Sequence, residues 1–272
     1  MAAFATPAAL AASLRPAFPA PRLTATRPYR VARNLPRMHT AHPGPAPSAS
    51  TRRRRPGEHK GFVEEMRFVA MRLHTKDQAP REGQQEASAL PIDAWYPSKS
   101  HFMQFLVDSL AVYHYFETEL VTPDSPHRIF SRFVNNGLER IPALQHDIAY
   151  LNTLGVETPQ PTVAATRYVQ YLRDLLEDKP ESVLCHWYNY YFAHSAGGRM
   201  IGRLMQDRLF GGHEFEFYKW ETDVKQILNK VRAIIDDVAS SWSREVKDEC
   251  LKETSLAFGY SGTVLQNLAK AA

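Results

Sequence analysis

The sequence predicts an all-α protein in which one helical bundle follows a long N-terminal segment of different composition. From Glu58 onwards, apolar residues recur at intervals of three and four, and clusters of Pro, Gly and Asn/Asp separate the amphipathic stretches. No stretch keeps the two-residue alternation of a half-buried strand. About 215 residues of helices and short loops are enough for a single-domain bundle with a sizeable core.

Residues 1–57 contain no Asp, Glu or Lys, yet they hold ten arginines and ten of the 19 prolines. Acid-free N-termini rich in Arg, Ala and Ser are typical of organellar transit peptides, whereas a secretory signal would show an apolar run of roughly 7–15 residues. The alternative is a disordered basic arm that binds nucleic acid, which the run Arg52–Arg55 alone would allow. We expect residues 1–57 to be a disordered transit peptide and residues 58–272 to be the folded domain.

The charge balance changes once this segment is removed. The whole chain has a formal charge of +4, but residues 58–272 carry 23 basic and 29 acidic residues, a charge of about −6. A nucleic-acid partner is therefore not expected for the folded domain. No run of about 18 apolar residues, the length that a membrane span needs, occurs in the chain. The two cysteines, Cys185 and Cys250, lack C-x-x-C spacing, which argues against a disulfide framework, a zinc site and an iron–sulfur cluster.

Each helix is placed by its apolar spacing and by its start and stop residues. The pattern of the first helix runs from Phe62 to Leu73, and Pro80 stops it. Thr162 can cap the fifth helix, and Gly211 ends the sixth. The predicted helices are 60–78, 99–120, 126–136, 141–154, 162–178, 181–209, 218–240 and 243–258, and the tail has room for one further turn.

The sixth predicted helix contains three glycines within six residues, Gly197, Gly198 and Gly202. Each costs about 1 kcal/mol relative to alanine in a helix, so a packing or functional gain must offset them. Either a neighbouring helix packs closely there, or the bare backbone borders a planar ligand. The flanking side chains would suit a large apolar ligand that bears carboxylates: Tyr188, Tyr190, Tyr191, Phe192, Arg199 and Arg203.

The first helix offers a candidate metal ligand. His74 follows Ala70 by four residues and Arg67 by seven, so the three lie near one helical face, with a small residue beside the imidazole. This arrangement leaves room for a porphyrin plane. A lone helical histidine is more often a surface or hydrogen-bonded residue, and spacing alone does not decide between these interpretations.

Two long motifs carry a family resemblance. Residues Lys60–Gln78 resemble the opening helix of the plant and algal plastid heme oxygenases, and Tyr191–Gly202 are similar to their distal helix. Shorter matches are residues 105–109, 136–140, 216–220 and 260–262, and the similarity covers essentially everything after Gly57.

The resemblance implies a heme oxygenase bundle with heme between a proximal and a distal helix. Such an enzyme uses heme as cofactor and substrate, and converts it with dioxygen and electrons from reduced ferredoxin to biliverdin IXα, carbon monoxide and ferrous iron. It also implies a chloroplast stromal monomer without a membrane span, with a bilin reductase as a candidate downstream partner. A docking patch for ferredoxin would use Arg199, Arg203 and Arg208.

The resemblance also implies roles for individual residues. His74 is the expected proximal iron ligand, with Ala70 beside it, and Gly197 and Gly198 are expected to select the ring edge that is opened. His194 occupies the position where other branches of the superfamily place an Asp that holds a water network, and it either organises water or packs as a core histidine. The expected propionate contacts are Arg67, Tyr188 and Arg232, with Lys225 and Lys230 nearby.

Three other functions compete with this interpretation. A non-catalytic tetrapyrrole-binding protein would share the fold, although relatives of that kind lack the axial histidine that His74 supplies here. A thiaminase-like hydrolase needs a cysteine nucleophile beside carboxylates, for which Cys185 is the candidate. A helical interaction protein would bind no heme at all.

Overall fold

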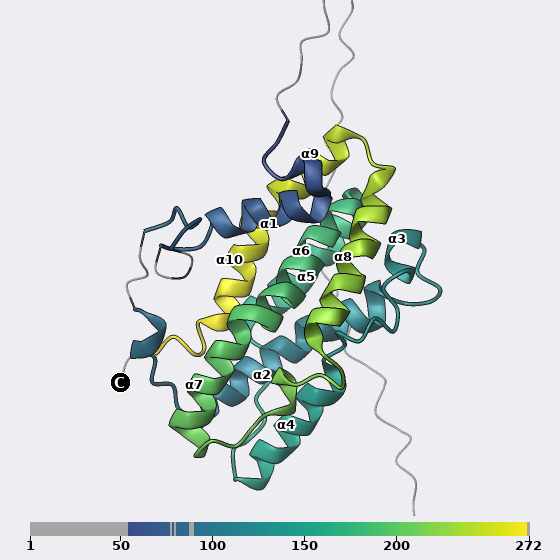
Figure 1. Cartoon of the computed structure of the whole chain (residues 1–272). Coiled ribbons are helices and arrows are strands. Elements are labelled where there is room, and N and C mark those ends of the chain that lie inside the picture. The colour runs from purple at the N-terminus through teal and green to yellow at the C-terminus, as the bar shows by residue number, and fades with distance from the viewer. Residues whose placement is uncertain (1–53, 77, 79, 87–89, 271–272) are drawn as a thin grey trace, which may run out of the picture. The chain divides into compact units, whose positions relative to one another are not determined.

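The computed structural model describes residues 54–270, except 77, 79 and 87–89. The predicted transit segment 1–57 therefore lies outside the described residues, apart from its last four. The α-helices are α1 (Phe62–Arg72), α2 (Lys99–His114), α3 (Arg128–Ser131), α4 (Ile141–Thr153), α5 (Val163–Asp178), α6 (Pro180–Ala193), α7 (Arg199–Phe210), α8 (Val224–Ser240), α9 (Arg244–Lys252) and α10 (Thr254–Leu265) (Figure 1). Two π-helical segments, η3 (Tyr115–Leu120) and η4 (His194–Gly198), and three 3-10 turns, η1 (Glu58–Lys60), η2 (Ile92–Ala94) and η5 (Glu216–Tyr218), complete the set.

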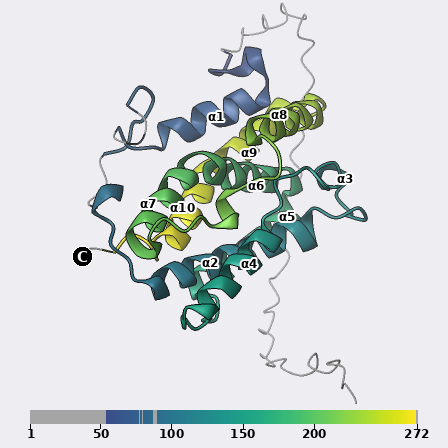
Figure 2. The same ribbon diagram turned by 60° about the horizontal axis from the view of Figure 1, so that its bottom comes forward.

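The predicted all-α bundle is confirmed. Helix α6 packs against α5, α9 and α10, while α2 packs against α4 and α5. Helix α1 packs against α8, α9 and α10, and Figure 2 shows α1 and α8 on one side of α6 with α2 and α4 on the other. Among the helices of the described residues, none combines the length and apolar character needed to cross a membrane.

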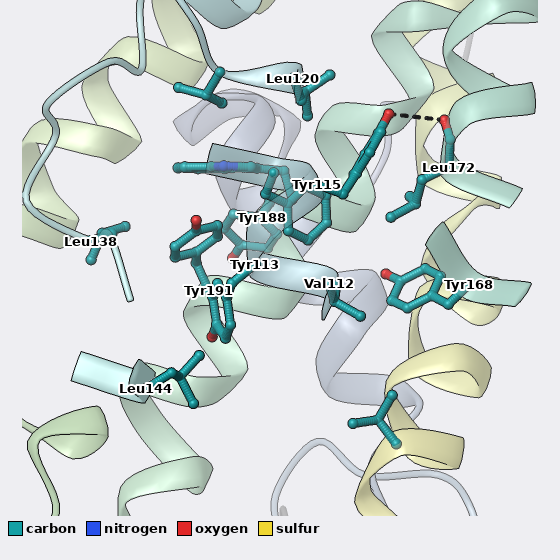
Figure 3. Close-up of a cluster of buried hydrophobic side chains, with 14 of the residues drawn as sticks. Val112, Tyr113, Tyr115, Leu120, Leu138, Leu144, Tyr168, Leu172, Tyr188 and Tyr191 are labelled. Atoms are coloured by element: carbon teal, nitrogen blue, oxygen red, sulfur yellow. Dashed lines mark hydrogen bonds between the residues drawn. The ribbon is translucent and has the colours of Figure 1, made fainter. Parts of the chain in front are cut away.

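Tyrosine rings fill much of the core between α2, α5 and α6 (Figure 3). The Tyr115 hydroxyl donates to the Leu172 carbonyl oxygen at 3.1 Å, which satisfies a polar group in an apolar setting (Figure 3). Two of the aromatic residues that flank the glycines belong to this core. Tyr190 packs edge-on against Tyr113, and the Tyr191 hydroxyl donates to Glu117 at 2.9 Å. They hold α6 in place and do not line an exposed site.

Helix α1 ends at Arg72 and not at Gln78 as predicted, because the following chain turns back and pairs with carbonyl groups at the end of the helix and just beyond it. The Gln84 amide donates to the carbonyl oxygens of Arg72 at 3.2 Å and of His74 at 3.1 Å. Gly83 permits this approach, since a Cβ there would lie 2.4 Å from the Thr75 carbonyl oxygen. His74 therefore lies just beyond the helix, in the turn.

Other predicted boundaries were wrong where tertiary contacts stop a helix. The seventh predicted helix begins at Val224 instead of Tyr218, because Asp223 caps it by accepting from the Lys225 amide at 3.0 Å. The eighth is divided at Glu253 into α9 and α10, and α10 continues to Leu265, well beyond the single turn expected for the tail. The third is only four residues long, and Asn135 adopts a positive φ of 53° behind it.

Gly202 is the glycine that helix packing requires. A Cβ at Gly202 would lie 2.7 Å from ring atoms of Tyr218. We expect Gly202→Ala to lower the free energy of unfolding by about 1–3 kcal/mol, as overpacking does. At Gly197 nothing lies within 4 Å of the added Cβ, so Gly197→Ala should raise stability by up to about 1 kcal/mol through helix propensity.

Urea denaturation of the two heme-free variants measures both values against the unmodified chain. Equal changes in the free energy of unfolding, in the same direction for both variants, would contradict the different roles of Gly202 and Gly197.

Candidate functional site

His74 is held in one tautomer by the helix that precedes it. Its Nδ1 lies 3.0 Å from the Ala70 carbonyl oxygen, and because a carbonyl only accepts, Nδ1 carries the hydrogen. Nε2 keeps its lone pair and makes no hydrogen bond with a described residue. Phe258 of α10 packs edge-on against the half-buried ring, with centroids 5.2 Å apart. A neutral imidazole oriented by a backbone carbonyl is the form in which histidine binds metals.

The predicted sixth helix runs as α6, η4 and α7 without a break, and its glycines differ in surroundings. The π-helical segment η4 widens the turn at His194–Gly198, as is frequent at functional sites. Ala193, Ala196 and Gly197 are exposed, and a Cβ at Gly197 would meet nothing within 4 Å. Close packing is therefore confirmed at Gly202, whereas Gly197 leaves bare backbone on an exposed surface, where the planar ligand stays a prediction.

His194 is a buried, hydrogen-bonded histidine. Its Nε2 donates to the Phe217 carbonyl oxygen at 2.8 Å, and its ring stacks on the Phe217 ring with centroids 4.0 Å apart. Nδ1 is then the acceptor nitrogen, and a Cβ at Gly198 would lie 3.1 Å from it. Burial lowers the pKa of His194 to about 3, and the charges of Arg140 and Arg199 act in the same direction. His194 is thus a neutral group whose free lone pair lies next to Gly198.

A buried carboxylate on α4 fixes the carbonyl that holds His194. Asp147 is fully buried and accepts from the amides of Glu216 at 3.0 Å and Phe217 at 2.8 Å. Arg140 contacts the same turn: its guanidinium lies 4.7 Å from the Trp220 ring centroid, and its Nη1 donates to the Phe217 carbonyl oxygen at 3.4 Å. Burial raises the pKa of Asp147, although both amides favour its ionised form. The η5 turn is therefore anchored from two sides, which orients the His194 ring.

Glu117 links this network to the core from the π-helical segment η3. It accepts from the Tyr191 hydroxyl at 2.9 Å and from the amides of Arg140 at 2.6 Å and Ile141 at 3.2 Å. The sequence assigned no role to Glu117, Arg140, Asp147 or Phe217. The only sequence signal was that residues 136–140 and 216–220, which include Arg140 and Phe217, resemble family segments. The second segment packs against the His194 ring through Phe217, Tyr218 and Trp220.

Three of the predicted propionate contacts lie close together. Tyr188 of α6 is buried, which raises the pKa of its hydroxyl, and the charges of Arg232 and Arg67 oppose that rise. The Arg232 guanidinium lies 5.1 Å from the centroid of Phe192, whose ring is 4.3 Å from that of Tyr188. Side chains from α1, α6 and α8 thus form one cationic, aromatic cluster.

Arg67 is engaged by two carboxylates. Its guanidinium contacts Glu64 at 3.0 Å and Glu82 at 2.9 Å, and these contacts raise its pKa above the ordinary value. A ligand carboxylate would have to replace one of them, so the propionate contact of Arg67 stays a prediction. Lys225 and Lys230 are exposed on α8.

The three arginines expected to dock ferredoxin also differ. Arg208 is used within the fold: it donates to the carbonyl oxygens of Asp93 and Trp95, and its guanidinium lies 4.3 Å from the Tyr96 ring centroid. Arg199 is half-buried and Arg203 is exposed. Of the predicted patch, only Arg199 and Arg203 are therefore open to a partner.

The residues fit a heme in three respects. His74 offers Nε2, the distal backbone at Gly197 is uncovered, and the charges of Arg232 and Arg67 act on the Tyr188 hydroxyl. No contact between described residues joins His74 to Gly197 or Gly198, which lie on separate elements, α1 and η4. His74 would hold a heme through the heme iron, and the bare backbone of η4 would border the ring.

The low pKa of His194 predicts an effect of pH on stability. Its folded pKa of about 3 lies below the ordinary 6.5, so the unfolded chain takes up the proton first as the pH falls. Stability from this group is complete above pH 6.5 and declines towards pH 3, by at most about 1.4 kcal/mol per pH unit. Urea denaturation between pH 7 and pH 5 should therefore show a smaller loss of stability for His194→Gln than for the unmodified chain. The variant His59→Gln, at an exposed position, is the control. An equal dependence of the unfolding free energy on pH in His194→Gln and in the unmodified chain would contradict this prediction.

Fold and site together define an all-helical bundle with a candidate metal-binding histidine after one helix and an exposed, glycine-rich backbone on another. A sequence model of the heme oxygenase family matches residues 92–267, from η2 into the segment after α10. The chain belongs to the heme oxygenase family.

Relatives and structures agree with this assignment. The chain is 48% identical over 218 residues to heme oxygenase 1, chloroplastic, of Arabidopsis thaliana, covering 79% of this chain and 76% of the relative. It is 32% identical over 274 residues to the probable inactive heme oxygenase 2, chloroplastic, of the same plant, covering 92% and 90%. The crystal structure of heme oxygenase-2 from Synechocystis, in complex with heme and NO, has a TM-score of 0.62 and 18% identity, covering 76% of this chain and 85% of that one. At that identity the likeness concerns the fold alone.

Proposed function

We propose that this chain is an active, ferredoxin-dependent heme oxygenase of the chloroplast stroma. It would cleave heme with dioxygen to biliverdin IXα, carbon monoxide and ferrous iron. The observation that carries the proposal is His74, whose Nδ1 donates to Ala70 and whose Nε2 is left for iron. The relatives at 45–48% identity are named as chloroplastic heme oxygenases, which supports the activity and the plastid location.

Heme supplies the redox chemistry when it is bound. The protein binds it through His74, orients it, and controls the space above it. Bare backbone at Gly197 leaves room for a small ligand on the distal side. His194 keeps an acceptor nitrogen beside Gly198, where it can hold a water for proton delivery. The cluster of Tyr188 and Arg232, with Arg67 after exchange of a carboxylate partner, would bind the propionates.

The alternative is a non-catalytic tetrapyrrole-binding protein. Relatives named as probable inactive heme oxygenases match this chain at 32% identity, below the 45–48% identity to the relatives named as heme oxygenases 1 and 3. The retained His74 also favours the enzyme. A thiaminase-like hydrolase is not supported, because Cys185 is fully buried and its thiol contacts the Thr254 hydroxyl at 3.3 Å.

A single series of measurements tests the proposal. Hemin is titrated into the purified chain, and the expected result is a Soret band that saturates at a one-to-one ratio. Reduced ferredoxin and dioxygen are then added, and biliverdin absorbance should appear, with turnover that falls as salt screens docking. Absence of the Soret band would eliminate both heme-binding functions, and a band without turnover would leave the non-catalytic one. A monomer and transfer of the product to a bilin reductase belong to the same proposal.

A further inference from the structure

A polar pocket of about 140 Å³ lies between α7 and the segment that contains η5. Its lining consists of side chains from these two segments: Arg199, Arg203, Gln206, Glu214, Phe215, Tyr218 and Lys219. None of the residues proposed to contact the heme lines it, so a ligand there would be additional to the heme.

Two cations in this lining are unpaired. Arg199 and Arg203 lie one helical turn apart, and neither makes a hydrogen bond or an ion pair with any residue that the structure describes. Like charges at this spacing destabilise a helix. Several other arginines of the described residues have carboxylate partners, as Arg173 has in Glu119 at 2.8 Å. An anion between the two guanidinium groups would remove the repulsion.

One buried polar group in this pocket also lacks a partner. Tyr218 is 8% exposed, and its hydroxyl is buried without a hydrogen bond in the described part of the chain. Leaving such groups unsatisfied is costly. Gln206, which is also 8% exposed, places a further polar side chain in the lining. The other cation, Lys219, is already paired with Glu216 at 2.9 Å and Glu214 at 3.4 Å.

We propose that this pocket binds a small oxyanion, a carboxylate or a phosphate, between Arg199 and Arg203, with the Tyr218 hydroxyl as a further donor. Guanidinium groups match the paired oxygens of both anions and form charge-assisted hydrogen bonds with them. The volume admits a group of this size, and the carboxylate of Glu214 at its edge disfavours a larger polyanion.

Calorimetric titration of the heme-free full chain with inorganic phosphate, and separately with acetate, tests the site. Ionic strength is kept constant with sodium chloride. We expect saturable one-to-one binding of at least one anion, which weakens at least about tenfold in the double variant Arg199→Gln/Arg203→Gln because its charge-assisted bonds are lost. Tyr218→Phe should weaken it several-fold while the ring remains against Gly202. The control variant Arg167→Gln removes one positive charge, half as many as the double variant, at an exposed position of α5. It should bind the anion as tightly as the unmodified chain does.

Absence of saturable binding by either anion, or equal affinity in the double variant and the unmodified chain, would overturn the proposal. Circular dichroism verifies that each variant is folded, and hemin titration verifies the heme site separately, so the two proposals can fail independently. The source of the anion follows from competition. If phosphate raises the ferredoxin concentration needed for half-maximal turnover, the pocket receives an acidic side chain of ferredoxin. If phosphate leaves that concentration unchanged, the ligand is a free anion. Both results support the anion site.

Discussion

Replacing His74 by alanine is expected to abolish the normal heme spectrum and to reduce biliverdin formation by more than about 100-fold. Substitutions that only touch the partners of a metal ligand already cost about 10–100-fold, and this one removes the ligand itself. The protein would retain the contacts around Tyr188 and Arg232, so some heme should still bind without its axial histidine. The measurements are the Soret position and width of the ferric complex, together with the initial rate of biliverdin formation.

Two controls make this prediction specific. His59→Ala removes an exposed histidine at the opposite end of α1 and should leave spectrum and rate unchanged. Added imidazole should restore a histidine-like spectrum in His74→Ala, because it supplies the missing nitrogen to the iron. An unaltered Soret band in His74→Ala would show that another residue binds the iron.

A leucine at Gly198 is expected to preserve heme binding but to reduce biliverdin IXα formation at least about tenfold, or to shift cleavage to another ring edge; a tenfold loss corresponds to 1.4 kcal/mol. The first carbon of the new side chain would lie 3.1 Å from Nδ1 of His194, so the imidazole must move. In the second variant, Gly197→Leu, the new side chain would enter open space. It should obstruct the distal surface without disturbing His194.

Hemin titration measures binding in both glycine variants, and chromatography of the biliverdin isomers measures the cleavage position. Ala233→Leu places the same side chain at an exposed position of α8 and should change neither. Unchanged yield and unchanged isomer distribution in Gly198→Leu would disprove the role of the distal glycines.

Much of the fold follows from local sequence. Apolar spacing and residues such as Thr162, whose hydroxyl accepts from the Ala165 amide, place most helices within a few residues. The end of α1 depends on residues farther along the chain, because the Gln84 amide of the returning segment pairs with the carbonyl of Arg72, the last residue of the helix. Likewise, nothing near Tyr218 signals that Asp147, some 70 positions earlier, holds this segment as a short turn.

The candidate site divides in the same way. The sequence alone determined which residue types are available: a histidine one turn after a small residue, and a glycine run whose helical cost demands a reason. Only the tertiary structure decided their roles, because each depends on what lies across from it. Gly202 faces the Tyr218 ring and Gly197 faces open space, although one helix carries both. Nε2 of His194 donates to the Phe217 carbonyl oxygen, a bond between groups 23 residues apart. The direction of the Nδ1 lone pair therefore depends on packing that no local pattern encodes.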